Sequence, residues 1–331
     1  MGSVNLERPV TDIYPLPPQL LVAVGGNAIH PEGILGTVEE QADYAAATGH
    51  ALLPLLTLKN QLVITHGNGP VVGKILMRQA IARERVTPMS LDICVAHSQG
   101  GIAYLLMQAL ENVLRENGNQ RHVACLLTQV EVDPDDPAFL APSKPVGYFY
   151  DTAEARGLAD ENGWTMREDA GRGWRYVVPS PKPQHIPDIS LARTLIDQGS
   201  VVIAGGGGGI PVVRGSKGMR RGVEAVIDKD LTSALMANLL GFDTMMILTA
   251  VSRVSIAFGT PGERSLDRVS LSEIRRHLSD GQFAPGSMAP KIEAVVQFIE
   301  GGGTHAVIGH LKEAIPALRG ETGTHIFADD A

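Results

Sequence analysis

Residues 20–28 read Leu-Leu-Val-Ala-Val-Gly-Gly-Asn-Ala, a short apolar run that ends in two glycines and an asparagine. Five consecutive apolar residues predict a strand that is buried on both faces, as in the parallel sheets of α/β proteins. Glycines directly after such a strand let backbone N–H groups approach an anion closely. This stretch therefore predicts both an α/β fold and an anion site at the end of its first strand.

Similar apolar runs recur along the chain. Further strands are predicted at residues 62–65, 93–96, 123–130, 201–204, 244–248 and 304–308. Segments with helix-like apolar spacing lie between or after these runs, at residues 38–58, 73–85, 101–115, 189–198, 230–240 and 288–300. Alternating strands and helices predict an α/β domain with a mainly parallel sheet.

Two regions depart from this alternation. Residues 1–18 contain four prolines and are predicted to form a loosely ordered extension. Residues 133–187 are rich in proline and charge and contain both tryptophans, Trp164 and Trp174. Because a structureless loop of that length is unusual in a compact domain, we predict an inserted subdomain or lid there.

Composition excludes several classes of protein. The 331 residues carry a net charge of −8, which argues against the basic face of a nucleic-acid-binding protein. No apolar run is long enough to span a membrane, and the N-terminus lacks the pattern of a signal peptide. Cys94 and Cys125 lie in apolar runs, typical of buried thiols in a reducing compartment. We therefore expect a cytoplasmic globular protein without a membrane or nucleic-acid partner.

The chain contains 37 glycines, and some of them form four clusters that each follow a predicted strand. They are Gly25-Gly26, Gly67–Gly69, Gly100-Gly101 and Gly205–Gly209. A single glycine cluster of this kind is typical of a tight turn. Ligands of open α/β sheets, however, bind beyond the carboxyl ends of the strands. Four glycine clusters at such positions therefore favour the binding of phosphate or carboxylate groups. The chain lacks the Walker motif and zinc-type spacing of His and Cys, so neither a P-loop nor a dedicated metal site is predicted.

A serine hydrolase is an alternative. Residues 96–100, Ala-His-Ser-Gln-Gly, approximate the nucleophile elbow G-x-S-x-G, between the predicted strand at 93–96 and a helix. Ser98 would then act with a later Asp and with His305, His310 or His325. Otherwise Ser98 and Gln99 cap the helix. Because the elbow does not account for the other glycine clusters, anion binding remains the leading interpretation.

Seven motifs, in order from about residue 20 to 327, resemble the carbamate kinases of the amino acid kinase family. They are Val22-Ala-Val-Gly-Gly-Asn-Ala28, Ile64-Thr-His-Gly-Asn-Gly-Pro70, Ala96-His-Ser-Gln-Gly-Gly-Ile-Ala-Tyr104, Pro142-Ser-Lys-Pro-Val-Gly147, Ala204–Val213, Ala225-Val-Ile-Asp-Lys-Asp230 and Ala284-Pro-Gly-Ser-Met-Ala-Pro-Lys291. The resemblance implies an αβα sandwich with a mainly parallel sheet, working as a homodimer. Residues 19–188 would form a carbamate-binding lobe with a protruding lid at about 133–187, and residues 189–331 a nucleotide-binding lobe.

The resemblance implies reversible phosphoryl transfer between ATP and carbamate, giving ADP and carbamoyl phosphate, with Mg²⁺ as the cofactor. The implied pathway is the catabolism of arginine and carbamoyl phosphate. A kinase of another small carboxylate on the same fold is the alternative. The attacking oxygen of carbamate is already anionic, so the reaction requires positioning and charge neutralisation rather than a general base.

The resemblance also implies roles for individual residues. The catalytic set is Lys229, Lys291, Asp230, Lys144 and Asn27. The set that binds the phosphoryl group and carbamate is Gly25, Gly26, Gly67, Asn68, Gly69, Ser98 and Gln99. The nucleotide-binding set is Gly206, Gly207, Gly208, Thr249, Ala250, Met288 and Lys291. Taken alone, Asn68 is also typical of a turn, and Lys144 of an exposed loop.

The resemblance implies that Asp230 orients Lys229 and Lys291 beside the phosphates. It also implies that the lid carries Lys144 over the bound anion. Lys291 falls in the first turn of a helix predicted to open at Ser287, so the helix dipole would add to its charge. The sequence departs from many relatives at residues 250–255, Ala-Val-Ser-Arg-Val-Ser, where an Asp and a Tyr are common. That stretch borders the nucleotide in the family, so the adenine and ribose contacts are expected to differ.

Overall fold

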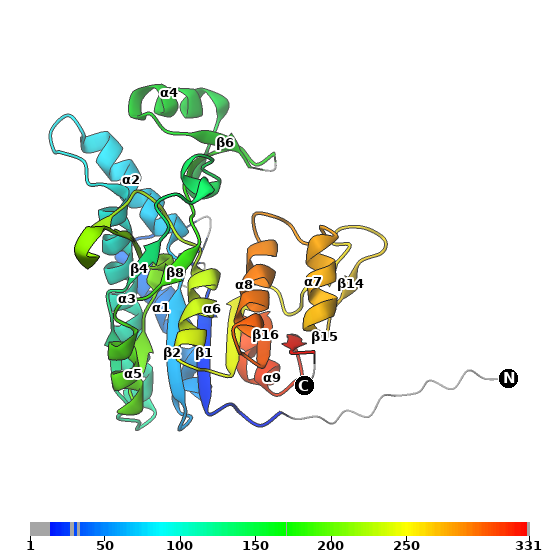
Figure 1. Ribbon diagram of the computed structural model, residues 1–331. Helices are drawn as coiled ribbons and strands as arrows, with labels where there is room; N and C mark the ends of the chain where they lie inside the picture. The colour runs from blue at the N-terminus through cyan, green and yellow to red at the C-terminus, as the bar shows by residue number, and fades with distance from the viewer. Residues whose placement is uncertain (1–13, 27–29, 32–33, 170, 330–331) are drawn as a thin grey trace.

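The computed structural model describes residues 14–26, 30, 31, 34–169 and 171–329, and within them eight strands form a central sheet (Figure 1). The strand order is β15-β17-β16-β12-β1-β2-β9-β3. Neighbouring strands are parallel except β16 and β17. Their bounds are β1 (Gln19–Val24), β2 (Gln61–His66), β3 (Val123–Cys125), β9 (Val201–Ile203), β12 (Thr244–Thr249), β15 (Arg268–Ser270), β16 (His305–His310) and β17 (Thr324–Phe327).

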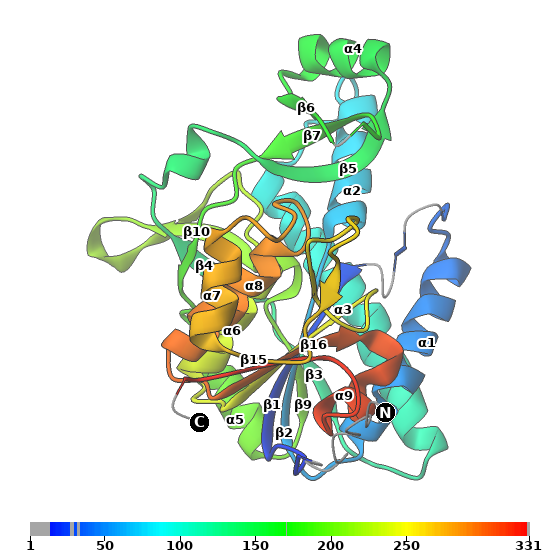
Figure 2. The same ribbon diagram turned by 90° about the vertical axis from the view of Figure 1, so that its right-hand side faces the viewer.

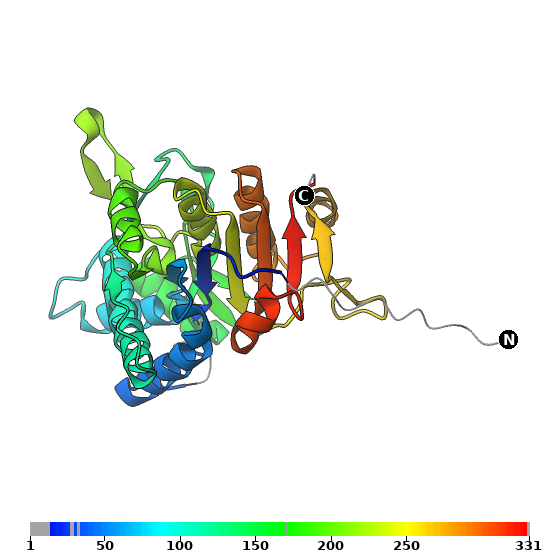
Figure 3. The same ribbon diagram turned by 90° about the horizontal axis from the view of Figure 1, so that it is seen from below.

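Helices cover both faces of this sheet (Figure 3). Alternate residues of β1 enter separate cores: Leu21 and Ala23 on one face, and Leu20 and Val22 on the other. The first face packs against α5 (Ile189–Asp197), α6 (Lys229–Leu239), α7 (Leu271–Ser279) and α8 (Ala289–Glu300). The second packs against α1 (Val38–Leu56), α3 (Leu91–Glu116) and α9 (Ala314–Leu318). The predicted αβα sandwich with a mainly parallel sheet is confirmed.

One predicted strand is wrong. Residues 93–96 belong to α3, which runs without a break through Gly100 and Gly101. Cys94 and Val95 are buried on the same side of this helix as Ser98, Gln99 and Ile102. The run therefore lies on a long helix, where Cys94 and Val95 are buried and Ile93 is exposed. The glycine cluster at 100–101 follows no strand.

The predicted strand at 123–130 is also wrong in its extent, because it divides into β3 and β4 (Gln129–Val132). β4 leaves the central sheet and joins a second, four-stranded sheet in the order β11-β10-β4-β8. The remaining strands of that sheet are β8 (Pro183–His185), β10 (Ile210–Arg214) and β11 (Arg220–Gly222). A two-stranded sheet of β13 (Ser255–Ile256) and β14 (Arg264–Ser265) was not predicted.

Residues 144–178, here called the lid, form a small antiparallel sheet of their own within the predicted insert. The lid contains β5 (Lys144–Tyr150), α4 (Thr152–Asn162), β6 (Met166–Glu168) and β7 (Trp174–Val178). It protrudes from the rest of the molecule beside α2 (Gly69–Ala82) (Figure 2). Its role as a moving cover stays a prediction.

The division into two lobes also stays a prediction. β9 follows the predicted boundary at residue 188, yet it lies between β2 and β3 in the sheet. Most of the predicted extension, residues 1–13, lies outside the described residues. None of the helices in the described part of the chain combines the length and the hydropathy that a membrane span requires.

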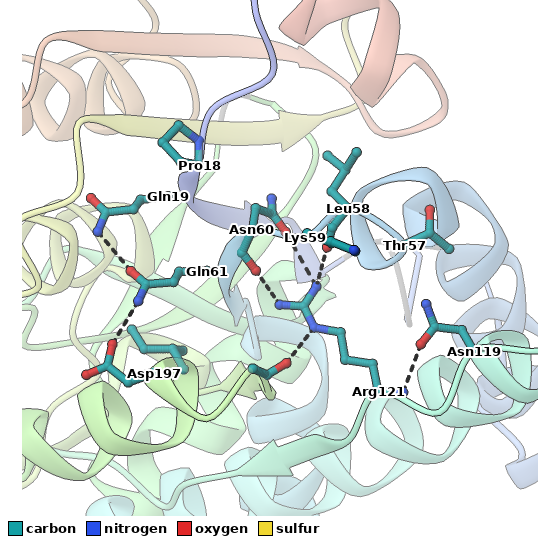
Figure 4. A pocket seen from close by; sticks show the side chains of 12 residues that line it. Pro18, Gln19, Thr57, Leu58, Lys59, Asn60, Gln61, Asn119, Arg121 and Asp197 are labelled. Carbon is teal, nitrogen blue, oxygen red and sulfur yellow. Dashed lines mark hydrogen bonds between the residues drawn. The ribbon is translucent and has the colours of Figure 1, made fainter.

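A cavity of about 730 Å³ opens where β1 and β2 begin, at the amino edge of the sheet (Figure 4). One wall is the half-buried guanidinium of Arg121, which donates to the backbone oxygens of Leu56 at 3.0 Å, Leu58 at 3.1 Å and Gly199 at 2.8 Å. These bonds satisfy carbonyl groups at or after the ends of α1 and α5. The cavity is therefore at the opposite edge of the sheet from the glycine loops, and Arg121 has a structural role.

Candidate active site

The glycine loops after β1 and β2 touch at the carboxyl edge of the sheet. Gly67 donates its N–H to the Val24 oxygen at 3.0 Å, and Gly25 donates to the Leu248 oxygen at 3.2 Å. A Cβ on Gly67 would lie 2.8 Å from the Gly26 nitrogen, so a side chain there would force the two loops apart. The approach explains why the second loop needs glycine. Asn27, predicted beside them, lies outside the described residues.

Asp230 joins two of the predicted lysines. Its Oδ2 accepts a hydrogen bond from Lys291 Nζ at 2.9 Å, and its Oδ1 accepts one from Lys229 Nζ. Lys229 and Asp230 are in the first turn of α6, and Lys291 is in the first turn of α8. Two separate helices thus bring three predicted catalytic residues into direct contact.

Burial and charge act in opposite directions on this cluster. Burial alone would raise the pKa of the Asp230 carboxyl, but the charges of Lys229 and Lys291 outweigh it, so this pKa lies below its usual range. Burial lowers the pKa of Lys229 in spite of Asp230. For Lys291, attraction to Asp230 outweighs the effect of burial, so its pKa is raised. Asp230 is therefore ionised at neutral pH and holds the ammonium groups in fixed positions.

A cavity of about 480 Å³ connects the first glycine loop with the lysines, and none of Gly67, Asn68 and Gly69 lines it. Gly25 and Gly26 form part of its wall together with Lys229 and Lys291, and the predicted nucleotide residues Thr249 and Ala250 also line it. The sequence did not predict a second set of lining residues: Tyr44 and Thr48 of α1, and His310, Leu311 and Lys312 at and after the end of β16. These residues carry no motif, and only the packing of α1 over the sheet beside the end of β16 brings them to the cavity.

Helix N-termini add positive potential at this edge. α2 begins at Gly69, directly after Asn68, and neither this N-terminus nor that of α8 is capped by a side chain. At α8 the N–H groups of Ala289 and Lys291 already donate to backbone oxygens and Pro290 has none, so this N-terminus contributes its helix dipole, which favours an anion. The prediction that Ser287 opens α8 is wrong, because Met288 precedes the first turn; Lys291 lies in that turn as expected. The chain is acidic overall, but this edge suits phosphate or carboxylate groups.

Ser98 and Gln99 support the loops from inside α3. Ser98 Oγ accepts a hydrogen bond from Asn68 Nδ2 at 2.8 Å and donates to the Val95 oxygen at 2.7 Å. Gln99 Nε2 donates to the Gly206 oxygen at 2.8 Å. Both side chains are buried and lie in the middle of the helix, so they do not cap it. The strand that a nucleophile elbow requires is absent, because residues 91–116 form one continuous helix.

The loop of five glycines packs behind the site. A Cβ on Gly206 would overlap the ring of His66, and one on Gly207 would overlap the amide of Asn68. Gly208 accepts a hydrogen bond from Thr232 Oγ1 at 2.8 Å. These contacts require glycine for close packing, and none of Gly206, Gly207 and Gly208 lines the cavity with the lysines. Their contact with a nucleotide stays a prediction, as does that of Met288, which packs against the core.

Lys144 reaches the same region from the lid. Its Nζ lies 2.8 Å from Oδ2 of Asp228, the residue before α6. Asp228 was not predicted as a site residue, and its one signal was the pattern Asp228-Lys229-Asp230. No group of three or more potential metal ligands occurs among the described residues. Both aspartates of the cluster already hold lysines, so they offer no free carboxylate pair for a metal ion.

Comparisons with known proteins agree with this geometry. The profile of the amino acid kinase family matches residues 19–310. Carbamate kinase from Pyrococcus horikoshii is 42% identical over 94% of this chain and 99% of its own length. Carbamate kinase-like protein YahI from Escherichia coli is 46% identical over 93% and 98%. The solved structure of carbamate kinase from Giardia lamblia bound to AMP-PNP has a TM-score of 0.87 and 41% identity, covering 95% of this chain and 99% of that one.

The ordered motifs, the fold and relatives that align over nearly the whole chain thus all indicate the same family. The chain belongs to the amino acid kinase family and is similar throughout to the carbamate kinases within it.

Proposed function

We propose that this protein is a carbamate kinase, which transfers a phosphoryl group reversibly between ATP and carbamate to give ADP and carbamoyl phosphate. The observation that carries the proposal is that Lys229 and Lys291, both paired with Asp230, line one cavity together with Gly25 and Gly26. Phosphoryl transfer develops negative charge on the equatorial oxygens, and fixed cations beside backbone N–H groups stabilise that charge. The names of the relatives support carbamate as the acceptor.

In this mechanism the protein positions groups and does not remove a proton. The anionic oxygen of carbamate attacks the γ-phosphorus directly and the bond to the ADP oxygen breaks, so the charge moves from one oxygen to the other. Lys229 and Lys291 keep their ammonium groups toward the transferring phosphoryl group because Asp230 holds them. The N–H groups of Gly25 and Gly67 are bonded to the oxygens of Leu248 and Val24, and these bonds fix the two glycine loops at the same edge of the sheet. Mg²⁺ enters with the nucleotide as part of the substrate.

The nucleotide is proposed to enter over Thr249 and Ala250, which line the cavity beside Lys291. The Giardia lamblia relative was solved with AMP-PNP, a nucleotide analogue by its name, which supports an ATP site. Ala250 presents a methyl group where a carboxylate is common in relatives, so the ribose loses one polar partner. We propose that carbamate lies on the side of Gly67, Asn68 and Gly69.

We further propose that the protein works in the cytoplasm as a homodimer in the catabolism of arginine and carbamoyl phosphate. Its two free cysteines suit a reducing compartment. Ile93 and Tyr104 are exposed on α3, and the exposed Leu127 lies beside Gly100 between them; a second copy of the chain would cover these apolar side chains. Sedimentation of the purified protein tests the dimer.

A second acceptor deserves a direct test, because one relative with 46% identity is named only carbamate kinase-like. Purified protein with ATP and Mg²⁺ is given carbamate, acetate, glutamate or N-acetylglutamate, and ADP release is measured. We expect turnover with carbamate well above that with the other three. Turnover with another acid in preference to carbamate would replace the proposed substrate and keep the phosphotransferase.

A further inference from the structure

Asp228 uses its two carboxylate oxygens for different purposes. Oδ1 accepts hydrogen bonds from the backbone nitrogens of Asp230 at 2.8 Å and Leu231 at 3.4 Å, and so caps α6. Oδ2 accepts a hydrogen bond from Lys144 Nζ at 2.8 Å, across 84 residues of sequence. Burial would raise the pKa of Asp228, but the charge and hydrogen bond of Lys144 outweigh it and the pKa is lowered. An ionised carboxylate fixed to a helix end thus holds a lysine of the lid.

The backbone of the lid is fixed close to this ion pair. Gly147, three residues after Lys144 on β5, has φ +76° and crosses Gly73 of α2. A Cβ on Gly73 would overlap the backbone of Gly147, so the strand and the helix touch without side chains between them. This crossing explains why residue 73 of α2 is a glycine, although no role in anion binding requires one there. The contact between Gly73 and Gly147 fixes the position of β5 against α2. Lys144, at the start of β5, reaches Asp228 from that position.

We propose that Asp228 is a positioning residue that keeps the ammonium group of Lys144 at the site for the anionic substrate. The inference rests on the proposed function. A lysine ammonium has three N–H donors. Lys144 gives one to Asp228, and two remain for oxygens of carbamoyl phosphate. Substrate binding therefore adds to this ion pair and does not replace it.

Asp230 positions Lys229 and Lys291 in the same way, through an ion pair with each. Together the three lysines and two aspartates leave one net positive charge, from +3 and −2. The two aspartates follow each other in the pattern Asp-Lys-Asp but serve different partners: Asp230 orients residues of the core, and Asp228 orients the residue of the lid. Without Asp228, the long side chain of Lys144 would lose a fixed partner and sample more rotamers.

The test uses Asp228→Asn, because asparagine still caps a helix but has no charge for Lys144. We expect this variant to raise the KM for carbamoyl phosphate about tenfold with a smaller change in kcat, since it weakens substrate binding. The KM for ADP should stay within about twofold of the parent value, because Lys229 and Lys291 keep their hydrogen bonds to Asp230. Asp228→Ala, which loses the cap as well, should unfold at a lower temperature than Asp228→Asn.

Lys144→Gln is the partner variant. It should raise the same KM, and the double variant should be no worse than Lys144→Gln alone, because both changes break one interaction. An unchanged or lower KM in Asp228→Asn, or effects of the two variants that multiply, would overturn the proposal. A lower KM would mean that Asp228 competes with the substrate for Lys144.

A measurement without substrate separates this inference from the proposed function. Brief acetylation of the full chain, read by mass spectrometry, reports how readily each lysine reacts. Lys144 should react roughly threefold or more faster in Asp228→Asn than in the parent protein, because the ion pair no longer holds it. The exposed Lys217 serves as the internal control and should not change. Equal Lys144 rates would overturn the positioning role, whereas absent kinase activity alone would overturn only the proposed function.

Discussion

Lys291 Nζ lies 2.9 Å from Oδ2 of Asp230, although 61 residues separate the two in the sequence. The contact joins the first turn of α8 to the first turn of α6, and Asp230 is almost completely buried. A buried carboxylate between two lysines is costly unless both partners remain, because an unpaired charge would be left in the interior. Asp230 therefore holds Lys229 and Lys291 as a fixed pair of cations.

Lys229→Ala and Lys291→Ala should each reduce kcat by at least about a hundredfold, as the loss of a charge contact in the transition state does. Lys217→Ala, on the exposed turn between β10 and β11, is the matched control and should keep its activity. Steady-state rates of ATP formation provide the comparison. Near-normal kcat values in the first two variants would remove these lysines from the site.

Gly73→Ala should destabilise the protein and displace the lid, because the added methyl group overlaps the backbone of Gly147. Overpacking of this kind costs about 1–3 kcal/mol. Gly157→Ala, in α4 of the lid, meets no atom within 4 Å and should leave stability unchanged or raise it by roughly 0.5–1 kcal/mol. Urea unfolding measures the free energy of unfolding of both variants and of the parent protein. Equal free energies of unfolding would contradict the close crossing of β5 and α2.

The free energy of unfolding should decrease as the pH falls below 6.5. Burial lowers the pKa of His66 to about 4 and that of His305 to about 3. Each histidine is neutral in the folded protein and binds a proton first in the unfolded chain. The stability is thus complete above pH 6.5 and is lost toward pH 3–4, by up to about 1.4 kcal/mol per pH unit for each histidine.

Denaturant unfolding at pH 7, 6 and 5 measures this loss before the carboxylates begin to titrate. His305 stacks on Phe327 with ring centroids 4.4 Å apart, so His305→Phe keeps an aromatic ring there. That variant should show a shallower decline with acidification than the parent protein. A parent stability that is constant between pH 7 and pH 5 would contradict burial of the neutral rings.

Arg121→Lys should lower the free energy of unfolding by about 2 kcal/mol, because an ammonium group cannot reach carbonyls that a guanidinium bonds on several sides. The kcat should not change, since Arg121 lies at the amino edge of the sheet (Figure 4). The control is the parent protein measured in the same unfolding and activity assays. A strong loss of kcat in a folded Arg121→Lys protein would show that this edge also affects the reaction.

Most of the central sheet could be predicted from the sequence, because its strands are buried on both faces and appear as continuous apolar runs. Residues 20–24 and 244–248 are examples, and both lie in the middle of the sheet. Residues 93–96 gave the same signal for another reason, since four apolar neighbours can also occur on a long helix with a wide buried face. The short strands β13 and β14 carry no such run and were missed.

The candidate site was predictable as far as motifs reach. The cluster of Lys229, Asp230 and Lys291 was inferred from the family resemblance, and the structure brings the three together. Asp228 was missed because its partner, Lys144, is in the lid, and no spacing rule relates the two. Ser98 was placed at the substrate side, yet it acts on Asn68 from within a helix. Only the packing of α3 against the loop reveals that relation.

We propose that phosphoryl transfer between carbamoyl phosphate and ADP takes place in the cavity that Lys229 and Lys291 line. The most direct test is ATP formation by the purified full chain from carbamoyl phosphate, ADP and Mg²⁺, followed with hexokinase and glucose-6-phosphate dehydrogenase. We predict sustained ATP formation that requires both substrates and is lost in Lys291→Ala. Absence of ATP formation by the folded parent protein, or an equal rate in Lys291→Ala, would contradict the account.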